Sequence, residues 1–320
     1  MLARRVTLKQ LRVFAEVARS GSMIGAAQAL NVSPPAVTLQ MQLLQGLVGL
    51  PLVEKLPTGL RLTEAGRELL LAVERIETNL TEAAALLAGL AGSERGRVTV
   101  GVISTAKYFA PGALAAFSRA HPKVDLNLVV GNRADIISGL RHYRLDIALM
   151  GQPPEGLTVE AAPIGDNPHV IVAAPEHPLA TLAIVDPKLL EEETFLVREP
   201  GSGTRSLMER FFADAGIGPQ LGPQIDSNET IKQAVIAGLG IAFISGHTVE
   251  AEIEAGRLVL LKVAGLPIVR QWYLVHLEER RLMPVVSALR DFLIDNGRHY
   301  LPEIPLDRRL PTYRKSKRRR

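Results

Sequence analysis

The chain has 320 residues and a formal net charge of +4, with 47% hydrophobic and 22% charged residues. This length exceeds one compact core, so we expect two or three domains, and the absence of cysteine excludes disulfides, thiolate nucleophiles and cysteine-ligated metals. No stretch approaches the roughly 20 apolar residues of a membrane span, and the basic, polar start is not typical of a secretory signal. We therefore expect a cytoplasmic protein without membrane contact.

Charge is distributed unevenly along the chain. Residues 1–66 have a net charge of +4 and residues 302–320 a net charge of +6, which leaves the middle acidic. Basic ends on an acidic body suit contact with a polyanion through the ends. For the tail at 302–320, a solvated and disordered end is at least as good an interpretation as a functional one.

Three short helices are predicted at the N-terminus. Residues 8–18 place apolar side chains at helical spacing, and Ser22 is a good N-cap for a second helix. Ser33 before Pro34 is another start signal, because proline is favoured at the first helical position. The third helix is expected to end near Leu47.

Two helices joined by so tight a turn indicate a helix-turn-helix, whose second helix enters the major groove of DNA. A hairpin predicted at residues 51–62 would be its wing, with basic side chains for phosphate. A three-helix bundle without a DNA role shares the apolar pattern and stays the alternative. The predicted DNA-binding residues are Ser33, Pro34, Pro35, Thr38, Gln40, Gln42, Lys55 and Arg61.

A long helix is predicted to begin after Thr63 and to run to about Ala88. Its apolar residues recur in alternating steps of four and three, which is typical of a coiled-coil seam. The seam consists of Leu69, Val73, Ile76, Leu80, Ala83 and Leu87. We therefore expect dimerisation through this helix.

Beyond a glycine-containing hinge at 89–96, short β-rich runs alternate with helical stretches. The predicted strands are Val98–Ile103, Leu126–Val130, Ile147–Met150, Val170–Ala174 and Ile241–Ile244. This alternation favours a parallel sheet covered on both faces. Chain crossings near 151–168 and 264–270 predict two lobes with a ligand cleft between them.

Two segments of the predicted cleft favour an anionic ligand. Residues 104–108 follow a strand, where hydroxyls and free N–H groups at a helix start attract negative charge. Residues 198–205 form a glycine-rich turn that can approach a phosphate or carboxylate closely. An ordinary turn with a helix N-cap is the alternative for both. The predicted effector-binding residues are Ser104, Thr105, Lys107, Asn132, Gly201, Ser202, Gly203, Thr204, Arg205 and His247.

The sequence gives little support for an enzyme, a metal site or a cofactor. The seven histidines lack metal-ligand spacing, and no nucleophile–base pair or paired carboxylates stand out. A transport-type solute binder with the same two lobes would need a signal peptide. Neither class explains residues 7–66, so we expect a protein that is not an enzyme.

Residues 7–300 resemble the LysR-type transcriptional regulators of bacteria. The resemblance rests on residues 8–14, 21–27, 32–38 and 60–66, which follow the family's order and spacing. It implies a winged helix-turn-helix at 1–63, a linker helix at 64–90, a two-lobed periplasmic-binding-protein-like (type 2) effector domain at 91–301 and a basic tail at 302–320. One departure is that Leu39, Gln42 and Leu43 stand where the family commonly has arginines, so base readout is expected to use hydrogen bonds and methyl contacts instead.

The resemblance also implies partners and an effector. Family members bind double-stranded promoter DNA at inverted repeats as dimers of dimers, and they recruit RNA polymerase in response to a small inducer. Residues 104–111 and the turn at 201–205 look most like the subgroup that controls carbon-fixation (Calvin-cycle, RuBisCO) operons. This implies an activator that senses a phosphorylated metabolite or NADPH. A regulator of another pathway that senses a carboxylate or inorganic anion remains the alternative.

Overall fold

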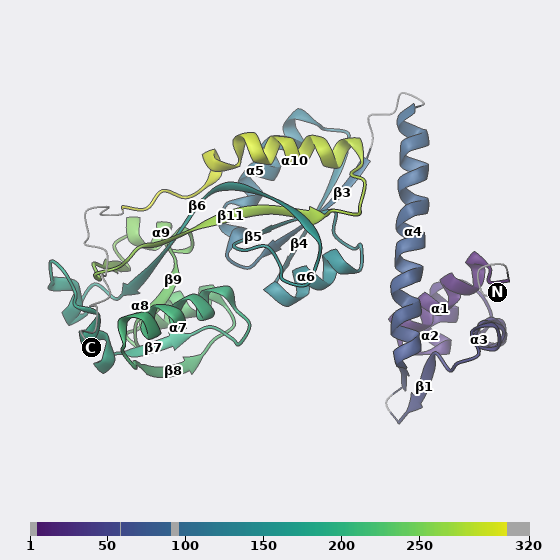
Figure 1. Cartoon of the computed structure of the whole chain (residues 1–320), viewed down its shortest axis with the longest axis horizontal. Coiled ribbons are helices and arrows are strands. Elements are labelled where there is room, and N and C mark those ends of the chain that lie inside the picture. Colours follow the sequence, from purple (N-terminus) through teal and green to yellow (C-terminus); the bar gives the residue numbers. More distant parts are fainter. Residues whose placement is uncertain (1–4, 58, 91–95, 306–320) are drawn as a thin grey trace, which may run out of the picture. The chain divides into compact units, whose positions relative to one another are not determined.

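The computed structural model describes residues 5–57, 59–90 and 96–305 of the chain (Figure 1). It divides into two compact units, Met1–Gly92 (unit 1) and Ser93–Arg320 (unit 2). Among the described residues, no helix has the length and apolar character needed to cross a membrane. Most of the predicted basic tail, from residue 306 onward, lies outside the described residues.

Unit 1 contains three short helices whose ends follow local sequence signals. They are α1 (Leu8–Ser20), α2 (Met23–Ala29) and α3 (Pro34–Val48). Thr7 and Gln10 form a capping box at the start of α1, and Gly21 ends it in the left-handed conformation. The Ser22 hydroxyl accepts a hydrogen bond from the Gly25 amide at the start of α2. The three helices enclose an apolar core that includes Phe14, Val17, Val37, Met41 and Leu44.

A hairpin and a long helix complete unit 1. Strands β1 (Val53–Leu56) and β2 (Gly59–Leu62) pair antiparallel, and α4 (Glu64–Leu90) follows. A Cβ added at Gly66 would lie 2.0 Å from the Leu52 carbonyl oxygen, so this packing requires glycine. The hinge predicted at 89–96 is shorter than expected, because α4 extends to Leu90 and the first strand of unit 2 begins at Gly96. Alanine and leucine near the end of α4 favour the helix.

Unit 2 is built on a seven-stranded mixed sheet in the order β10-β6-β11-β5-β3-β4, with β9 paired to β6. Its strands are β3 (Gly96–Ile103), β4 (Val124–Gly131), β5 (Ile147–Met150), β6 (Val159–Ala173), β9 (Ala242–Ser245), β10 (Val259–Leu261) and β11 (Ile268–Leu277). Of the described pairs in this sheet, only β3–β4 and β3–β5 are parallel, whereas β6 and β11 pair antiparallel. The predicted wholly parallel sheet is therefore wrong.

A long strand begins inside each of the two predicted crossings. β6 and β11 pair with each other from Ile268↔His169 to Leu277↔Val159, with a register shift between Trp272 and Tyr273. The long pair runs from one lobe to the other (Figure 1). Its backbone groups are satisfied by a partner about a hundred residues away in sequence, which no local pattern reveals.

Helices cover the sheet in each lobe, and each lobe has its own apolar core. In the first lobe they are η2 (Ala106–Tyr108), α5 (Ala110–Ala120), α6 (Arg133–Arg141), α10 (Pro284–Asn296) and η6 (Gly297–Tyr300). The second lobe contains η3 (Pro178–Thr181), η4 (Pro187–Glu192), β7 (Thr194–Val197), α7 (Gly203–Ala215), β8 (Gln220–Gln224), α8 (Asn228–Ile236), η5 (Gly246–Thr248) and α9 (Glu250–Glu254). Two cores joined by a strand pair leave room for a cleft.

Candidate functional sites

Helix α3, which is predicted to enter the major groove of DNA, has a buried face and an exposed face. Val37, Met41 and Leu44 lie in the core of unit 1. The exposed predicted residues are Ser33, Pro34, Pro35, Thr38 and Gln42, whereas Gln40 is half-buried. Leu39 and Leu43 are also exposed, at 53% and 48%, so the outer face offers both polar groups and methyl groups to a partner.

The start of α3 differs in detail from the sequence expectation. Ser33 occupies the N-cap position, but its hydroxyl makes no capping hydrogen bond. A capping side chain binds the second or third helical N–H, yet Pro35 has none and the Ala36 amide donates to the Ser33 carbonyl at 3.0 Å. Ser33 therefore presents an exposed hydroxyl at the tip of the helix. Thr38, one turn on, donates its hydroxyl hydrogen to the Pro34 carbonyl at 3.0 Å.

The hairpin β1–β2 carries the two predicted phosphate ligands. Lys55 and Arg61 are both exposed. Arg61 Nε lies 2.9 Å from Glu54 Oε1 across the strand pair. Because both partners are exposed, this ion pair is weak and a phosphate could replace the carboxylate.

The seam of α4 is buried in its first half and exposed in its second. Val73 is 1% exposed and lies in the core of unit 1. Ile76, Leu80 and Leu87 are 38%, 44% and 67% exposed. This row of apolar side chains lacks cover in the described part of the single chain, as expected of a dimerisation surface.

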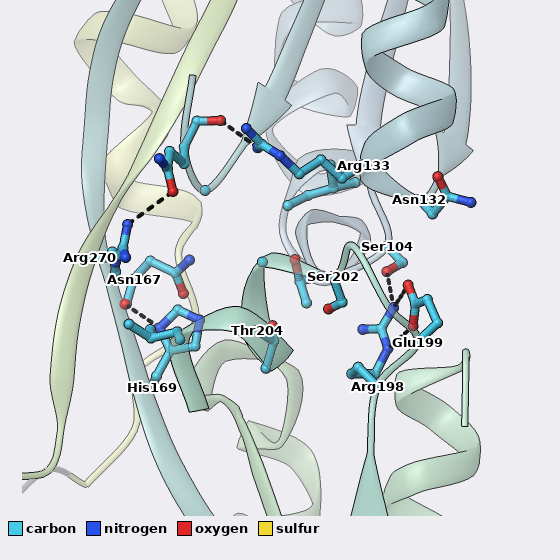
Figure 2. A pocket seen from close by; sticks show the side chains of 16 residues that line it. Ser104, Asn132, Arg133, Asn167, His169, Arg198, Glu199, Ser202, Thr204 and Arg270 are labelled. Carbon is cyan, nitrogen blue, oxygen red and sulfur yellow. Dashed lines mark hydrogen bonds and ion pairs between the residues drawn. The ribbon is translucent and has the colours of Figure 1, made fainter. Parts of the chain in front are cut away.

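A cavity of about 610 Å³, including its open mouth, lies between the two lobes of unit 2 (Figure 2). The lining residues are Ile103, Ser104, Thr105, Asn132, Arg133, Gly151, Gln152, Asn167, His169, Arg198, Glu199, Ser202, Gly203, Thr204, Leu207 and Arg270.

Six predicted effector residues lie in this lining. They are Ser104, Thr105, Asn132, Ser202, Gly203 and Thr204. The loop after β3 supplies the first pair, the N-cap of α6 supplies Asn132, and the start of α7 supplies the last three. The helix after residues 104–105 is the three-residue η2 rather than an α-helix, so the dipole expected there is small.

Four predicted effector residues lie outside the lining. Lys107 Nζ lies 5.2 Å from the centre of the Tyr108 ring. Arg205 pairs with Glu209 at 2.8 Å and donates to the Arg198 carbonyl at 2.9 Å. The other two are Gly201 and His247.

Each of those two has a local structural role. Gly201 adopts a φ of +84° in the turn before α7, a conformation that favours glycine. His247 is buried, and its Nδ1 accepts a hydrogen bond from Trp272 Nε1 at 3.0 Å.

Several polar lining residues were missed by sequence reasoning. Arg133 follows the predicted Asn132 by one position, and Arg198 and Glu199 begin the predicted glycine-rich turn, so their segments had been located. Asn167 and His169 lie on β6. The sequence pattern placed Asn167 in the predicted crossing at 151–168 and began the next strand only at Val170. The others are Gln152 and Arg270. Gln152 follows the predicted strand β5 by two residues, whereas Arg270 reaches the cavity through the pairing of β11 with β6.

Arg198 is the most buried cation of the cavity, with 5% of its side chain exposed. Its guanidinium pairs with Glu199 through two contacts, at 2.7 and 2.8 Å. It also donates to Asn228 Oδ1 at 2.5 Å and, across the lobes, to Ser104 Oγ at 3.4 Å. Glu199 thus neutralises Arg198 while Ser104 links the guanidinium to the opposite lobe (Figure 2).

His169 is a neutral hydrogen-bond acceptor in the cavity wall. Burial, aided by the positive charge of Arg270, lowers the pKa of His169 to about 4. Its Nδ1 lies 3.1 Å from the Asn167 carbonyl oxygen. Since a carbonyl only accepts, Nδ1 carries the proton and Nε2 keeps a lone pair. Figure 2 shows the ring at the cavity edge near Thr204.

No group of histidine, aspartate and glutamate side chains within the described ranges could hold a metal ion. The cavity instead combines hydroxyls, amides and guanidinium groups. Such a set binds oxyanions and hydroxyl groups by hydrogen bonds.

Both units match known family models. Residues 8–67 match the bacterial regulatory helix-turn-helix protein, lysR family, and residues 91–298 match the LysR substrate binding domain. The chain belongs to the LysR family of transcriptional regulators. The predicted fold class, a winged helix-turn-helix with a two-lobed effector domain, is therefore confirmed.

Two relatives and one solved structure are similar to all or part of this chain. An "HTH-type transcriptional regulator CbbR" of Xanthobacter flavus is 53% identical over 301 residues, which cover 93% of this chain and 90% of the relative. A "RuBisCO operon transcriptional regulator" of Allochromatium vinosum is 45% identical over 91% of this chain and 97% of the relative. The Synechocystis PCC6803 CcmR regulatory domain in complex with 2-PG is 33% identical, with a TM-score of 0.61, and the match covers 63% of this chain and 97% of the domain.

These matches establish the general activity of the LysR regulator. It is a DNA-binding transcriptional regulator rather than an enzyme. Its second unit is a substrate-binding domain of the kind that takes small effectors. DNA contact and effector sensing thus reside in separate units.

Proposed function

We propose that this regulator activates carbon-fixation (RuBisCO) operons when a small phosphorylated metabolite binds in the cavity of unit 2. The observation that carries the proposal is the cavity itself, which lies between two lobes and is lined by hydroxyls and three guanidinium groups. The names of the two relatives support the choice of operon.

The cavity favours a compact anion as the effector. Ser104, Ser202 and Thr204 offer hydroxyls from both lobes, so one ligand can contact both and favour a closed arrangement. The related CcmR domain holds 2-PG, which supports a small ligand for this cavity. NADPH is the second effector we propose to test, since it also carries phosphate groups.

In unit 1, we assign DNA contact to α3 and the hairpin. Ser33, Pro34, Pro35, Thr38 and Gln42 would face the major groove of a promoter inverted repeat. Gln40 is half-buried and has a smaller share, and Lys55 and Arg61 would contact phosphates beside the groove.

The exposed seam of α4 supports a homodimer or homotetramer. Ile76, Leu80 and Leu87 would be covered by a second copy of the helix. Two copies present two reading helices, which matches the two halves of an inverted repeat. We further propose that the DNA-bound assembly acts in the cytoplasm and contacts RNA polymerase.

The first experiment is a gel shift of the purified protein on the DNA upstream of its own coding region. Ribulose bisphosphate, phosphoenolpyruvate and NADPH are added separately, with glucose as an uncharged control. A change in specific binding by one of the three supports the whole proposal. Specific binding that none of them changes contradicts the carbon-fixation effector and favours a regulator of another pathway, which would sense a carboxylate or inorganic anion.

A further inference from the structure

Two arginines of the cavity hold the same glutamine through different oxygens. Arg133, the first residue of α6, donates to the carbonyl oxygens of Gln152 at 2.7 Å and Pro153 at 3.0 Å. Arg270, on β11, donates to the side-chain oxygen of Gln152 at 3.2 Å. In Figure 2 Arg133 and Arg270 come from separate elements, and dashed lines mark their hydrogen bonds to the residue between them. Gln152 therefore lies between two positive charges.

Within the described ranges, neither guanidinium is in an ion pair with a carboxylate. Arg198 across the cavity differs, because Glu199 neutralises it at 2.7 Å. Arg133 and Arg270 are half-buried. Burial lowers the pKa of Arg133, and the more distant charge of Glu155 only partly opposes this. Two partly desolvated cations held by neutral oxygens gain strongly from an anion.

The two contacts of Gln152 differ in how easily a ligand can replace them. Its carbonyl oxygen is fixed by the backbone that follows β5 and holds Arg133 in place. Its side chain is exposed, and the single bond to Arg270 is long at 3.2 Å. An oxyanion can therefore replace the amide oxygen on Arg270 without disturbing the backbone.

We propose that Arg133 and Arg270 together bind one phosphate group of the effector, and that the Gln152 side-chain oxygen occupies the Arg270 part of this site when the effector is absent. The assignment rests on the proposed function of the cavity as an effector site. A phosphate monoester suits two guanidinium groups, because its three terminal oxygens can accept from both at once. Binding joins α6 of the first lobe to the strand pair that connects the lobes.

Gln152→Glu tests this geometry with almost no change in size. The new carboxylate would stand where the amide stands and supply the anion within the chain, so it competes with the ligand. Full-length protein is titrated with inorganic phosphate and with phosphoenolpyruvate by calorimetry. We expect at least a tenfold loss of affinity in Gln152→Glu, and at most a threefold change in Gln152→Ala.

Arg133→Gln and Arg270→Gln are each expected to lose at least tenfold in the same titrations. Arg133→Lys keeps the positive charge but loses the planar pair of N–H donors. Its affinity for the anions should therefore lie between those of the wild type and of Arg133→Gln. Arg144→Gln is the matched control, because Arg144 is exposed and lies outside the cavity lining. Thermal unfolding confirms that each variant is folded.

Three results would overturn the assignment: no binding of either anion to the wild type, wild-type affinity in both arginine-to-glutamine variants, or equal affinity in the Gln152→Glu and Gln152→Ala variants. The gel shift separates this assignment from the proposed function. If phosphate binding needs both arginines but no metabolite changes operator binding, the assignment stands and the proposed function fails. If a phosphorylated metabolite shifts operator binding equally in the wild type and in both arginine variants, the assignment alone fails.

Discussion

The two units hold their functional residues in opposite ways. In unit 1 the candidate DNA contacts lie within residues 33–61, on one helix and one hairpin, and most of them are exposed. In unit 2 the cavity lining spans residues 103 to 270 and comes from many separate elements. A DNA duplex needs a protruding surface, whereas a small ligand needs an enclosing one.

The difference teaches how each site is coupled to folding. Exposed residues on α3 can change without disturbing the core beneath them, since Val37, Met41 and Leu44 hold the helix independently. Cavity residues such as Arg198 and His169 are buried and hydrogen-bonded. Substitutions in the cavity are thus expected to affect stability and binding together, whereas those on α3 affect binding alone.

The largest expected effect is a loss of stability in the core of unit 1 alone. Phe14→Ala removes a side chain that is 0% exposed at the centre of unit 1, and large-to-small changes of this kind cost about 3 to 5 kcal/mol. We expect unit 1 to unfold at a lower temperature and DNA binding to weaken. Phosphate binding in unit 2 should persist. Calorimetry measures it at a temperature below the lowered unfolding transition of unit 1.

Phe117→Ala is the matched variant in unit 2, because Phe117 is also 0% exposed. It should weaken phosphate binding and leave the unfolding of unit 1 unchanged. If each substitution lowers both transitions equally, the units unfold as one and the comparison is wrong.

The same contrast explains what the sequence could predict. α1, α2 and α3 were located because capping residues, prolines and apolar spacing lie within each helix. The first half of β6 and all of β11 were missed, because these strands are formed by pairing with each other and, for β11, with β5. Pro163, Gly165 and Pro168 interrupt the first half of β6, so its local pattern is not typical of a strand.

The candidate site follows the same division. Ser104, Asn132 and Ser202 were predicted because each stands at a local junction of strand and helix. Arg270 lies on a strand that only tertiary pairing defines, so its sequence context carried no signal. Arg205 and Lys107 were chosen for charge beside such junctions, yet their side chains turn to Glu209 and Tyr108 instead.

The next largest effect concerns the surface of α4. Leu80 is 44% exposed on the apolar seam, so Leu80→Glu should place a charge in the proposed dimer interface. We expect self-association to weaken by about 100-fold, equivalent to about 2.7 kcal/mol. Sedimentation velocity over a range of concentrations measures this shift.

Leu182→Glu provides the control for Leu80→Glu. Leu182 is similarly exposed at 39%, but it lies in unit 2, so its variant should associate like the wild type. If Leu80→Glu leaves the association constant unchanged, the α4 seam is not the dimer surface.

A third prediction concerns the effect of pH on the stability of unit 2 through the buried side chain of His247. Burial lowers the pKa of His247 from 6.5 to about 4, and the charge of Asp166 only partly opposes this. The unfolded chain therefore takes up the proton first, so the stability conferred by the neutral ring is full above about pH 6.5 and is lost as the pH falls towards about 4. At about pH 5 the loss should be about 2 kcal/mol.

His247→Gln isolates this contribution, because the glutamine oxygen can still accept from Trp272 Nε1. Urea unfolding of unit 2 is followed at about pH 7.5 and about pH 5. The variant should lose about 2 kcal/mol less than the wild type over this interval. Parallel losses in both proteins would show that His247 does not titrate with folding.

The smallest expected effect lies on the exposed face of α3, where binding should change without stability. Gln42 is exposed, and a glutamine amide can form two hydrogen bonds with adenine in the major groove. Gln42→Ala should weaken operator binding by about fivefold to tenfold, or about 1 kcal/mol. Fluorescence anisotropy with operator and random duplexes at one salt concentration measures both affinities.

Random DNA should bind the Gln42→Ala variant almost as well as the wild type, since no phosphate contact is lost. Gln28→Ala, at an exposed position on α2, is the control and should change neither affinity. An equal loss on operator and random DNA would mean that Gln42 contacts phosphate only. Base readout by α3 would then depend on the remaining exposed groups, Thr38 and the methyl groups of Leu39 and Leu43, and their substitution would become the decisive measurement for unit 1.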